Sequence, residues 1–370
     1  MRIGYDAKRA FKNFTGLGNY SRSVISIMSD FYPQNEYLLY TPPYDKEKVK
    51  FSSENIKIIQ PKGLWHFFNS FWRSFSIAAL LKKNKVDIYH GLSHELPSGI
   101  KKSRAKSIVT MHDLIVLRYP HLYKPADRKI YLRKYKYACT NADLVIAISE
   151  QTKQDLIDFM GVDEKKIRLV YQGCDPQFYE QKTEQQKAEV KSKYNLPDSY
   201  ILNVGTIEPR KKLLTIVKAL PFISPELHLV VVGKPTEYMK EINSEITKNN
   251  LTNRVHFLHK LPFNNLPTVY QQAKVFVYPS VFEGFGIPIL EALNSRIPVI
   301  AANTSSLPEV GGNAALYIEP DDYETLAKSI TEICENPDLQ QKMIETGITQ
   351  ATKFREDIIA KELWKVYTEL

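Results

Sequence analysis

The sequence predicts an α/β protein with two doubly wound, Rossmann-like domains that face each other across a cleft. Short β-branched segments alternate with longer helical segments along most of the chain, and a polar stretch at residues 180–193 interrupts this alternation once. Strands separated by helices form βαβ units and therefore parallel sheets. The length of 370 residues suits two such domains. In doubly wound sheets, ligands bind beyond the carboxyl ends of the strands.

Each half of the chain contains its own run of expected strands. In the first half these are Arg2–Tyr5, Tyr37–Tyr40, Ile56–Ile59, Val86–Tyr89, Ser107–Thr110, Leu144–Ile148 and Ile167–Val170. Helical length and spacing are found between them at Asn19–Phe31, Phe67–Lys83, Asp127–Ala138 and Glu150–Phe159. In the second half the strands are Tyr200–Val204, His228–Val232, Val255–Leu258, Val275–Tyr278, Pro298–Ala301 and Ala315–Ile318. The helices between them begin near Lys211, Thr236, Leu266, Ile287 and Tyr323.

The connection between the domains is expected near residue 180, because the polar stretch there is followed by a turn at Asn195–Asp198. We therefore expect an N-terminal domain at residues 1–180 and a C-terminal domain at residues 181–352. The final segment, residues 353–370, contains an amphipathic helix with one apolar stripe. We expect this helix to pack back toward the N-terminal domain.

Composition excludes several classes of protein. Apolar residues make up 43% of the chain and charged residues 25%, which is ordinary globular usage. No apolar run approaches the about 18 residues that a membrane span needs, and the charged first ten residues lack the apolar core of a signal peptide. The three cysteines are scattered without a CxxC pair, which disfavours a disulfide framework. We expect a cytoplasmic protein.

Positive charge is concentrated in the first half. Residues 1–185 carry 30 Lys and Arg against 19 Asp and Glu, a net charge of +11, whereas residues 186–370 carry a net charge of −2. The density is highest at residues 101–136, where eleven basic residues face two acidic ones. Such a surface attracts phosphates in nucleic acid, anionic lipid or a charged substrate. A solvated basic face is the alternative.

The segment Val275–Asp322 carries the clearest chemical signal. Its strand ends at Ser280, and a loop with two glycines then leads into a helix. Glu283 lies on the loop and Glu291 eight positions later, in the early turns of the helix. Two carboxylates beside a loop that lets backbone amides approach closely suit a polyhydroxyl ligand. The alternative is an early glutamate that only complements the helix dipole.

Several segments in this order resemble the family 4 glycosyltransferases, which have the GT-B fold. EGFGIPILEA at residues 283–292 looks like their Glu-x7-Glu signature, and GTIEPRKKL at residues 205–213 is similar to the start of their donor domain. TMHDLIVLRYP at residues 110–120, ADLVIAISEQTKQDL at 142–156 and VYQGCDPQF at 170–178 also match their motifs. The resemblance covers nearly the whole chain.

The resemblance implies that the C-terminal domain binds a nucleotide-sugar donor and the N-terminal domain an acceptor. Glu291 would bind the donor ribose, and Glu283 would reach hydroxyls of the transferred sugar. The backbone amides that hold the same sugar would be those of Gly284, Phe285 and Gly286. Arg210 and Lys211 match the family's basic pair for the diphosphate.

The residues themselves support this role for Arg210 and Lys211. A departing nucleoside diphosphate gains negative charge, which positioned cations stabilise. Metal-dependent sugar transferases commonly use an Asp-x-Asp pair, and the sequence contains none. The cationic role then falls to this pair, and we expect no metal and no cofactor. The alternative is a solvated helix start, where cations would oppose the dipole.

A second glycine loop, with Gly16 and Gly18, follows the first strand. A dinucleotide fingerprint would need a third glycine where Ser21 stands, which disfavours a nicotinamide enzyme. The resemblance implies that this loop approaches the donor phosphates. A plain tight turn is the alternative.

Three histidines follow strand ends in the first half. The resemblance places His112 beside the reacting sugar, as a contact or a group that polarises the transition state. His90, His94 and Asp113 are expected on the acceptor side. A zinc site built from the three histidines would need ligands at regular spacing, and no helix presents them in that way.

The aromatic segment Trp65–Phe75 allows two interpretations. It forms either a core helix or an interfacial helix that meets anionic lipid through its aromatics and nearby cations. Nucleic acid is the rival partner of the basic face, but no recognised binding motif is present. We expect no nucleic-acid partner.

Together with these patterns, the resemblance implies a retaining, metal-independent transfer of a hexose to a glycan or lipid-linked glycan in cell-surface polysaccharide synthesis. GDP-mannose is the expected donor and UDP-glucose the alternative. A catalytically inactive protein that binds nucleotide sugar or membrane is the alternative from another class. The expected place is the cytoplasm, with peripheral attachment at the inner face of the membrane.

Overall fold

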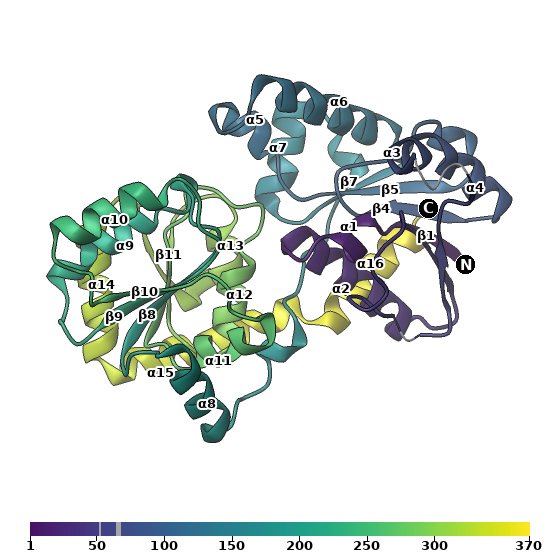
Figure 1. Cartoon of the computed structure of the whole chain (residues 1–370). Helices are drawn as coiled ribbons and strands as arrows, with labels where there is room; N and C mark the ends of the chain where they lie inside the picture. Colours follow the sequence, from purple (N-terminus) through teal and green to yellow (C-terminus); the bar gives the residue numbers. More distant parts are fainter. Residues whose placement is uncertain (52, 64–67) are drawn as a thin grey trace. The chain divides into compact units, whose positions relative to one another are not determined.

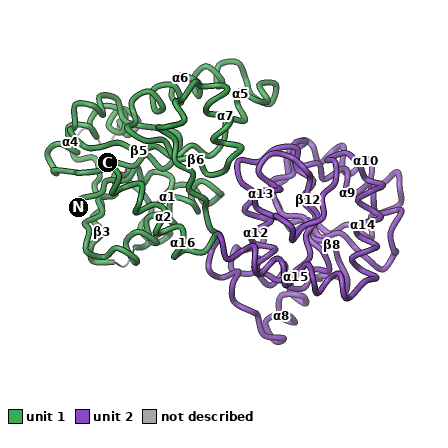
Figure 2. Tube along the Cα trace, turned by 180° about the vertical axis from the view of Figure 1, so that it is seen from behind, with its two compact units in different colours: residues 1–173, 354–370 green, residues 174–353 purple. Residues whose placement is uncertain are grey.

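The computed structural model describes residues 1–51, 53–63 and 68–370 (Figure 1). Two compact units divide the chain (Figure 2). Unit 1 comprises Met1–Gly173 and Phe354–Leu370, and unit 2 comprises Cys174–Lys353. The division therefore falls between Gly173 and Cys174 rather than at residue 180, because the residues after Gly173 already pack on unit 2. Phe178, for example, packs edge-on against Tyr270, with ring centroids 5.6 Å apart.

Unit 1 contains a seven-stranded parallel sheet in the order β3-β2-β1-β4-β5-β6-β7. Its strands are β1 (Arg2–Asp6), β2 (Glu36–Tyr40), β3 (Ile56–Ile59), β4 (Ile88–Gly91), β5 (Lys106–Met111), β6 (Leu144–Ala147) and β7 (Ile167–Leu169). Its helices are α1 (Lys8–Lys12), α2 (Gly16–Phe31), α3 (Asn69–Phe71), α4 (Ile77–Lys83), α5 (Ile115–Arg118), α6 (Pro125–Asn141), α7 (Glu150–Met160) and α16 (Glu356–Thr368). Ile3 on β1 lies opposite both Tyr37 and Ile88, which fixes the register at the centre of the sheet.

Unit 2 contains a six-stranded parallel sheet in the order β10-β9-β8-β11-β12-β13. Its strands are β8 (Tyr200–Val204), β9 (His228–Val232), β10 (Val255–Leu258), β11 (Val275–Tyr278), β12 (Val299–Ala302) and β13 (Ala315–Ile318). Its helices are α8 (Glu184–Tyr194), α9 (Leu213–Ala219), α10 (Met239–Lys248), α11 (Leu266–Gln271), α12 (Ile287–Asn294), α13 (Leu307–Gly311), α14 (Tyr323–Glu335) and α15 (Pro337–Ala351). Short 3₁₀ turns in the chain include Ile100–Lys102, Pro120–Leu122, Pro176–Phe178, Pro209–Lys211 and Leu220–Phe222.

The expected α/β class with two doubly wound parallel sheets is confirmed, and every expected strand is present. The largest shift concerns Val86–Tyr89, which becomes β4 at Ile88–Gly91. Val86 instead closes the end of α4, where its N–H donates to the carbonyl of Leu81 at 3.0 Å. Helices α13 and α15 had no counterpart among the expected elements. Local signals for α15 exist, since Asn336 caps it and Pro337 begins it.

Local capping explains where several helices begin and end. The Ser149 side chain accepts a hydrogen bond from the Thr152 N–H at the start of α7, and Gly161 ends this helix with φ of +61°. Thr183 forms a capping box with Gln186 at the start of α8. These caps satisfy backbone groups that have no partner inside the helix.

The C-terminal helix α16 belongs to unit 1 and lies beside α2 (Figure 1). The Trp364 ring stacks on Tyr32 with centroids 4.3 Å apart, and the buried Tyr367 hydroxyl lies 3.1 Å from that of Tyr5. The chain end therefore completes the core of the unit in which the chain begins.

The aromatic segment differs from a continuous amphipathic helix. Within the described residues, α3 passes into one turn of π-helix at Trp72–Ser76 and then into α4. The π turn shifts the phase of the side chains. Trp72 is 2% exposed and packs in the core, whereas Phe68, Phe71 and Phe75 are 59–60% exposed. Trp65 lies outside the described residues. Among the helices that the structure describes, none is long and apolar enough to cross a bilayer.

Candidate active site

Two loops of unit 2 meet beyond the carboxyl ends of β8 and β11. The first runs from Gly205 into the 3₁₀ turn Pro209–Lys211, and the second contains Glu283. The Val281 N–H donates to the carbonyl of Arg210 at 2.9 Å and so joins the loops. Adjacent parallel strands end at the same edge of a sheet. Residues that are about 70 positions apart therefore come together there.

Gly205 is required by a close approach at this edge. Its φ is +148°, and a Cβ added to it would lie 2.9 Å from the Cδ atom of Lys211. The glycine thus leaves room for the Lys211 side chain to pass the end of β8 toward Glu283.

One carboxylate oxygen of Glu283 accepts from four donor groups. Its Oε1 lies 2.9 Å from Lys211 Nζ, 2.8 Å from an Arg210 guanidinium nitrogen, 2.9 Å from the Tyr278 hydroxyl and 2.8 Å from Ser280 Oγ. The side chains of Glu283, Arg210 and Lys211 are only 13–14% exposed. Hydrogen bonds to a charged group are among the stronger ones in proteins. The three charged groups are therefore held in place before any ligand arrives.

The electrostatics of this cluster keep Glu283 ionised. Burial alone would raise the pKa of its carboxyl, but Lys211 and Arg210 outweigh burial and lower the pKa to about 2. Burial opposes the charge of Arg210, yet Glu283 and Glu208 raise its pKa above the ordinary value. Glu208 is the second carboxylate on Arg210, at 2.6 Å. Arg210 is therefore charged at neutral pH.

A hydroxyl-rich segment after β12 fixes the Glu283 loop. The Glu283 N–H donates to Ser305 Oγ at 3.0 Å, and Ser306 Oγ donates to the carbonyl of Phe285 at 2.6 Å. Thr304 Oγ1 donates to the carbonyl of Ser280 at 2.9 Å. The sequence analysis did not predict the role of these hydroxyl residues, nor that of Tyr278 and Ser280. The run of three hydroxyl residues shortly after a strand is the sequence signal that could have indicated it.

Glu291 is the fifth residue of α12 and is 6% exposed. The buried Tyr270 hydroxyl donates to its Oε2 at 2.9 Å. Burial raises the pKa of Glu291 to about 7, although the bond from Tyr270 acts in the opposite direction. A glutamate that only complements the dipole would be solvated. A buried carboxylate with one tyrosine partner instead fits a ligand that donates hydrogen bonds.

The other predicted donor residues of unit 2 lie on the loop between these two glutamates. Gly284 and Phe285 continue the loop after Glu283, and the Phe285 side chain is 2% exposed. Gly286 is the N-cap of α12 with φ of +122°. The loop therefore leads directly from Glu283 into the helix that carries Glu291. A role for these three amides stays a prediction.

In unit 1, the two glycines of the first loop have different surroundings. A Cβ on Gly18 would lie 1.7 Å from the carbonyl oxygen of Asn13, so packing alone demands a glycine there. Gly16 is exposed, begins α2 and has open space around it. Close packing of α2 against the Asn13 backbone, rather than a tight turn, accounts for Gly18, and a donor contact by either residue stays a prediction.

His112 follows β5 and is 5% exposed. Its Nε2 lies 2.8 Å from the carbonyl oxygen of Leu92. A carbonyl can only accept, so Nε2 carries the hydrogen and Nδ1 presents a lone pair. Burial lowers the pKa of His112 to about 3, and His94 lowers it further. The imidazole is therefore neutral, with one nitrogen able to accept a hydrogen bond from a sugar hydroxyl.

His90 is wholly buried, and its contact with an acceptor stays a prediction. Its Nδ1 lies 2.7 Å from the Tyr367 hydroxyl and its Nε2 lies 2.8 Å from Thr110 Oγ1. Tyr20 bonds the same Thr110 hydroxyl at 3.0 Å and sets its ring edge against His112, with centroids 4.5 Å apart. His90 thus belongs to a buried polar chain between α16 and the His112 region.

His94 and Asp113 have local structural contacts. His94 is 8% exposed, its Nε2 accepts a hydrogen bond from the His112 N–H at 2.9 Å, and its ring stacks on Tyr135 at 4.8 Å. Asp113 accepts from the Ile115 N–H at 3.1 Å, at the start of α5. The acceptor contacts of His94 and Asp113 stay predictions. In the part of the chain that the structure describes, no three His, Cys, Asp or Glu side chains are grouped to hold a metal ion.

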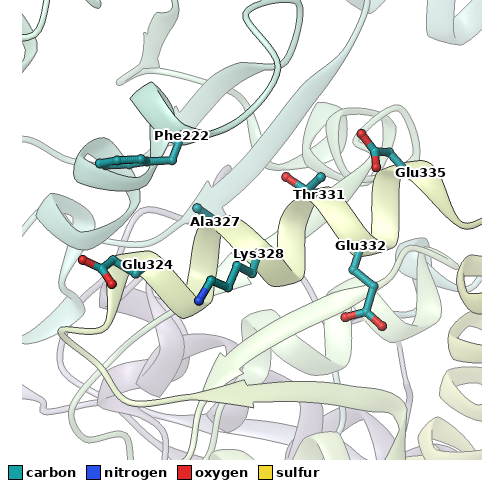
Figure 3. Close-up of a pocket in the computed structure, with 7 residues that line it drawn as sticks. All are labelled: Phe222, Glu324, Ala327, Lys328, Thr331, Glu332 and Glu335. Carbon is teal, nitrogen blue, oxygen red and sulfur yellow. The ribbon is translucent and has the colours of Figure 1, made fainter.

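A groove of about 640 Å³ lies along α14, away from the predicted residues (Figure 3). The residues that line it are Phe222, Glu324, Ala327, Lys328, Thr331, Glu332 and Glu335. Figure 3 shows the α14 side chains along one helix and Phe222 on a neighbouring turn. None of the predicted donor or acceptor residues lines this groove.

Solved structures with a similar chain path identify the fold. Sucrose-phosphate synthase from Thermosynechococcus elongatus superposes with a TM-score of 0.78 and 22% identity, covering 100% of this chain and 98% of that one. The Anabaena protein Alr3699/HepE, solved with UDP and glucose, gives a TM-score of 0.76 at 18% identity, with both chains covered completely. The fold is GT-B, the fold of nucleotide-sugar glycosyltransferases.

Sequence comparison then gives the family. The model of group 1 glycosyl transferases matches residues 184–350, and that of glycosyltransferase family 4 matches residues 34–178. The chain therefore belongs to the glycosyltransferases that these two models describe, with a family 4 domain followed by a group 1 domain. It is 28% identical to the O-antigen chain mannosyltransferase B of Escherichia coli, over 74% of this chain and 72% of that protein. It is 26% identical to the O-antigen chain mannosyltransferase RfbU of Salmonella typhimurium, over 84% and 81% respectively.

Proposed function

We propose that this glycosyltransferase moves mannose from GDP-mannose to a glycan or lipid-linked glycan, with retention of configuration and without a metal ion, in cell-surface polysaccharide synthesis. The observation that carries the proposal is the preformed cluster in which Lys211 and Arg210 share one oxygen of Glu283. The similarity to two O-antigen mannosyltransferases supports mannose as the sugar.

The proposed reaction exchanges one bond at the anomeric carbon of the donor. The bond from this carbon to the diphosphate oxygen breaks, and its electron pair leaves with GDP. The acceptor hydroxyl forms the new bond on the same face, and its proton passes to a donor phosphate oxygen. No other reactant is consumed. Positioning of the two sugars supplies much of the rate.

The roles follow from the charges of the side chains. Lys211 and Arg210 stabilise the departing diphosphate as its charge grows, and Glu283 both aligns them and accepts from sugar hydroxyls. Glu291 accepts from the ribose. Neutral His112 accepts from the transferred sugar. Unit 2 thus binds the donor and unit 1 the acceptor.

A panel of nucleoside diphosphates tests the donor. We expect GDP to raise the melting temperature more than UDP, ADP or CDP, because a ligand at a hundred times its Kd stabilises the fold by about 2.7 kcal/mol. Hydrolysis of GDP-mannose without acceptor should continue in EDTA.

Preferential stabilisation by UDP would favour UDP-glucose as donor. Complete loss of hydrolysis in EDTA would contradict the metal-free proposal. Binding of nucleotide without any donor hydrolysis or transfer would indicate the catalytically inactive alternative. Each outcome thus identifies one of the alternatives.

We also propose that unit 1 attaches the enzyme peripherally to the inner face of the membrane. Three aromatic side chains, Phe68, Phe71 and Phe75, are 59–60% exposed on one short segment, and the rings of Phe71 and Phe75 stack at 5.8 Å. Lys82 and Lys83 are exposed at the end of the following helix. Exposed aromatics beside cations fit an anionic lipid surface.

Replacing Phe71 and Phe75 by serine should weaken sedimentation with phosphatidylglycerol vesicles about tenfold or more, since each Phe side chain that leaves water contributes about 1.5–3 kcal/mol. Melting should barely change, because both rings are exposed. Phe222→Ser is the matched control, since Phe222 is 63% exposed on unit 2. Binding should also weaken as salt rises. No vesicle binding at low salt, or equal loss in the control, would contradict the proposal.

A further inference from the structure

A chain of ion pairs crosses the strand ends of unit 1. Arg73 is 15% exposed and donates from Nε to the Asp6 carboxylate at 3.1 Å, and it also pairs with Glu95. Lys134, on α6, reaches the other oxygen of Glu95 at 2.8 Å. The Arg73 guanidinium and both carboxylates are therefore already occupied by one another.

Two more cations stand beside this chain. Lys8 and Arg9 open α1, directly after β1, and both are partly buried. The Lys8 N–H bonds the Asp6 carboxylate at 3.3 Å. Within residues 1–51, 53–63 and 68–370, no carboxylate forms an ion pair with either side chain. We call Lys8, Arg9, Arg73 and Lys134 the cation cluster. It carries four positive charges against the two of Asp6 and Glu95.

The excess charge destabilises the unliganded cluster. Burial lowers the pKa of Lys8 to about 8, and Arg73 and Arg9 lower it further while Asp6 only partly compensates. Burial and Arg73 also lower the pKa of Lys134. Like charges held together are costly unless an anion joins them. The cluster therefore carries an excess of positive charge that a bound anion would offset.

The cluster adjoins the predicted acceptor region. Glu95 follows β4 and is next to His94, whose Nε2 accepts from the His112 N–H. Burial is the main cause of the lowered pKa of both histidines, and the charge of Arg9 lowers it further. The cluster thus lies at the carboxyl ends of β1 and β4, where doubly wound sheets bind ligands.

We propose that Lys8 and Arg9, supported by Arg73 and Lys134, bind a phosphate or diphosphate group beside Asp6 and Glu95, at the carboxyl ends of β1 and β4. A guanidinium can hold a phosphate through two parallel hydrogen bonds, and an excess of two positive charges suits a diphosphate. That this anion belongs to the sugar acceptor rests on the proposed function. The anion site itself rests on unit 1 alone. A diphosphate on the acceptor and the headgroup of an anionic lipid are two sources of the same chemistry.

Inorganic pyrophosphate is the probe, titrated calorimetrically into protein saturated with GDP so that the nucleotide site is filled. Wild-type protein should bind one pyrophosphate, and Lys8→Gln and Arg9→Gln should each weaken this binding about tenfold or more. Lys12→Gln is the matched control, because Lys12 is an exposed lysine of the same helix outside the cluster. All three variants should keep the wild-type affinity for GDP and the wild-type melting temperature.

Vesicles separate the two sources. Neutral vesicles doped with a polyprenyl diphosphate should lose binding in the Lys8 and Arg9 variants if the acceptor supplies the anion, whereas vesicles of phosphatidylglycerol should lose it if a headgroup does. Absence of saturable pyrophosphate binding, or equal binding by the Lys8, Arg9 and Lys12 variants, would overturn the site. Failure of GDP to bind would instead count against the proposed function. The anion site would still be measured in that case, by comparing pyrophosphate binding in the wild type with that in a double variant that carries both Lys8→Gln and Arg9→Gln.

Discussion

Arg210→Ala and Lys211→Ala are each expected to lower the rate of sugar transfer about 30- to 1,000-fold. Removal of one charge-assisted contact to a developing diphosphate costs about 2–4 kcal/mol in the transition state. The fold should survive, because each variant leaves the other cation on Glu283. The measurement is kcat with GDP-mannose, alongside a melting curve.

Lys212→Ala is the matched control for this pair. Lys212 is the next residue in the chain, but its side chain pairs with Asp321 at 2.6 Å rather than with Glu283. We expect nearly wild-type turnover from this variant. Full activity in both the Arg210 and Lys211 variants would refute the assignment, and an equal loss in the Lys212 variant would show that local charge alone matters.

The second prediction is that substitutions of Glu291 and Glu283 change different quantities, namely GDP affinity and turnover. Glu291→Gln should weaken GDP binding about 10- to 100-fold, because a ribose contact is made equally in the ground and transition states. Glu283→Gln should lower turnover at least about 100-fold and leave GDP affinity equal or higher, since Lys211 then lacks its carboxylate partner and Arg210 keeps only Glu208. GDP titration and kcat measure the two effects. The reverse pattern would exchange the roles.

The pH dependence of GDP binding tests whether Glu291 contacts the ribose in its ionised form. Its pKa is about 7, and the ionised form is the one that accepts hydrogen bonds from both ribose hydroxyls. GDP affinity should therefore fall as pH drops through 7, by up to about tenfold per unit below it. Glu291→Gln should flatten this part of the profile. Tyr270→Phe should move the midpoint upward, because the bond from Tyr270 holds the pKa down. An unchanged profile in both variants would contradict a titrating Glu291.

Some residues of the candidate site can be recognised from the sequence, and others only from the packed structure. Glu283 and Glu291 stand out in the sequence, since a glycine loop and a helix start surround them within ten residues. Tyr278 and Tyr270 do not, because a tyrosine in a buried strand or helix looks like any core aromatic. Only the packed structure shows that their hydroxyls reach the two carboxylates. A buried hydroxyl must find a partner, but the sequence does not say which.

The histidines also show what the sequence could not predict. The order of strand and histidine predicted correctly that His112 follows a strand, whereas His90 lies inside β4 rather than after it. Their different roles depend on Tyr367, which is 277 positions from His90 and buries it beneath the last helix. The Trp72 and Phe71 side chains differ in the same way, since these neighbours point in different directions and only the packing shows that Trp72 faces the core.

The sequence by itself determined the strands, the two parallel sheets and the family motifs, because side-chain periodicity, turn residues and capping act over a few neighbouring positions. The tertiary structure alone decided which charges meet. Lys211 reaches Glu283 because β8 and β11 end at one edge, and Lys8 stands beside Arg73 because β1 ends where the π turn passes. Ion pairs and hydrogen bonds act over a few ångströms in space, and the packing of the sheet sets those distances rather than separation along the chain.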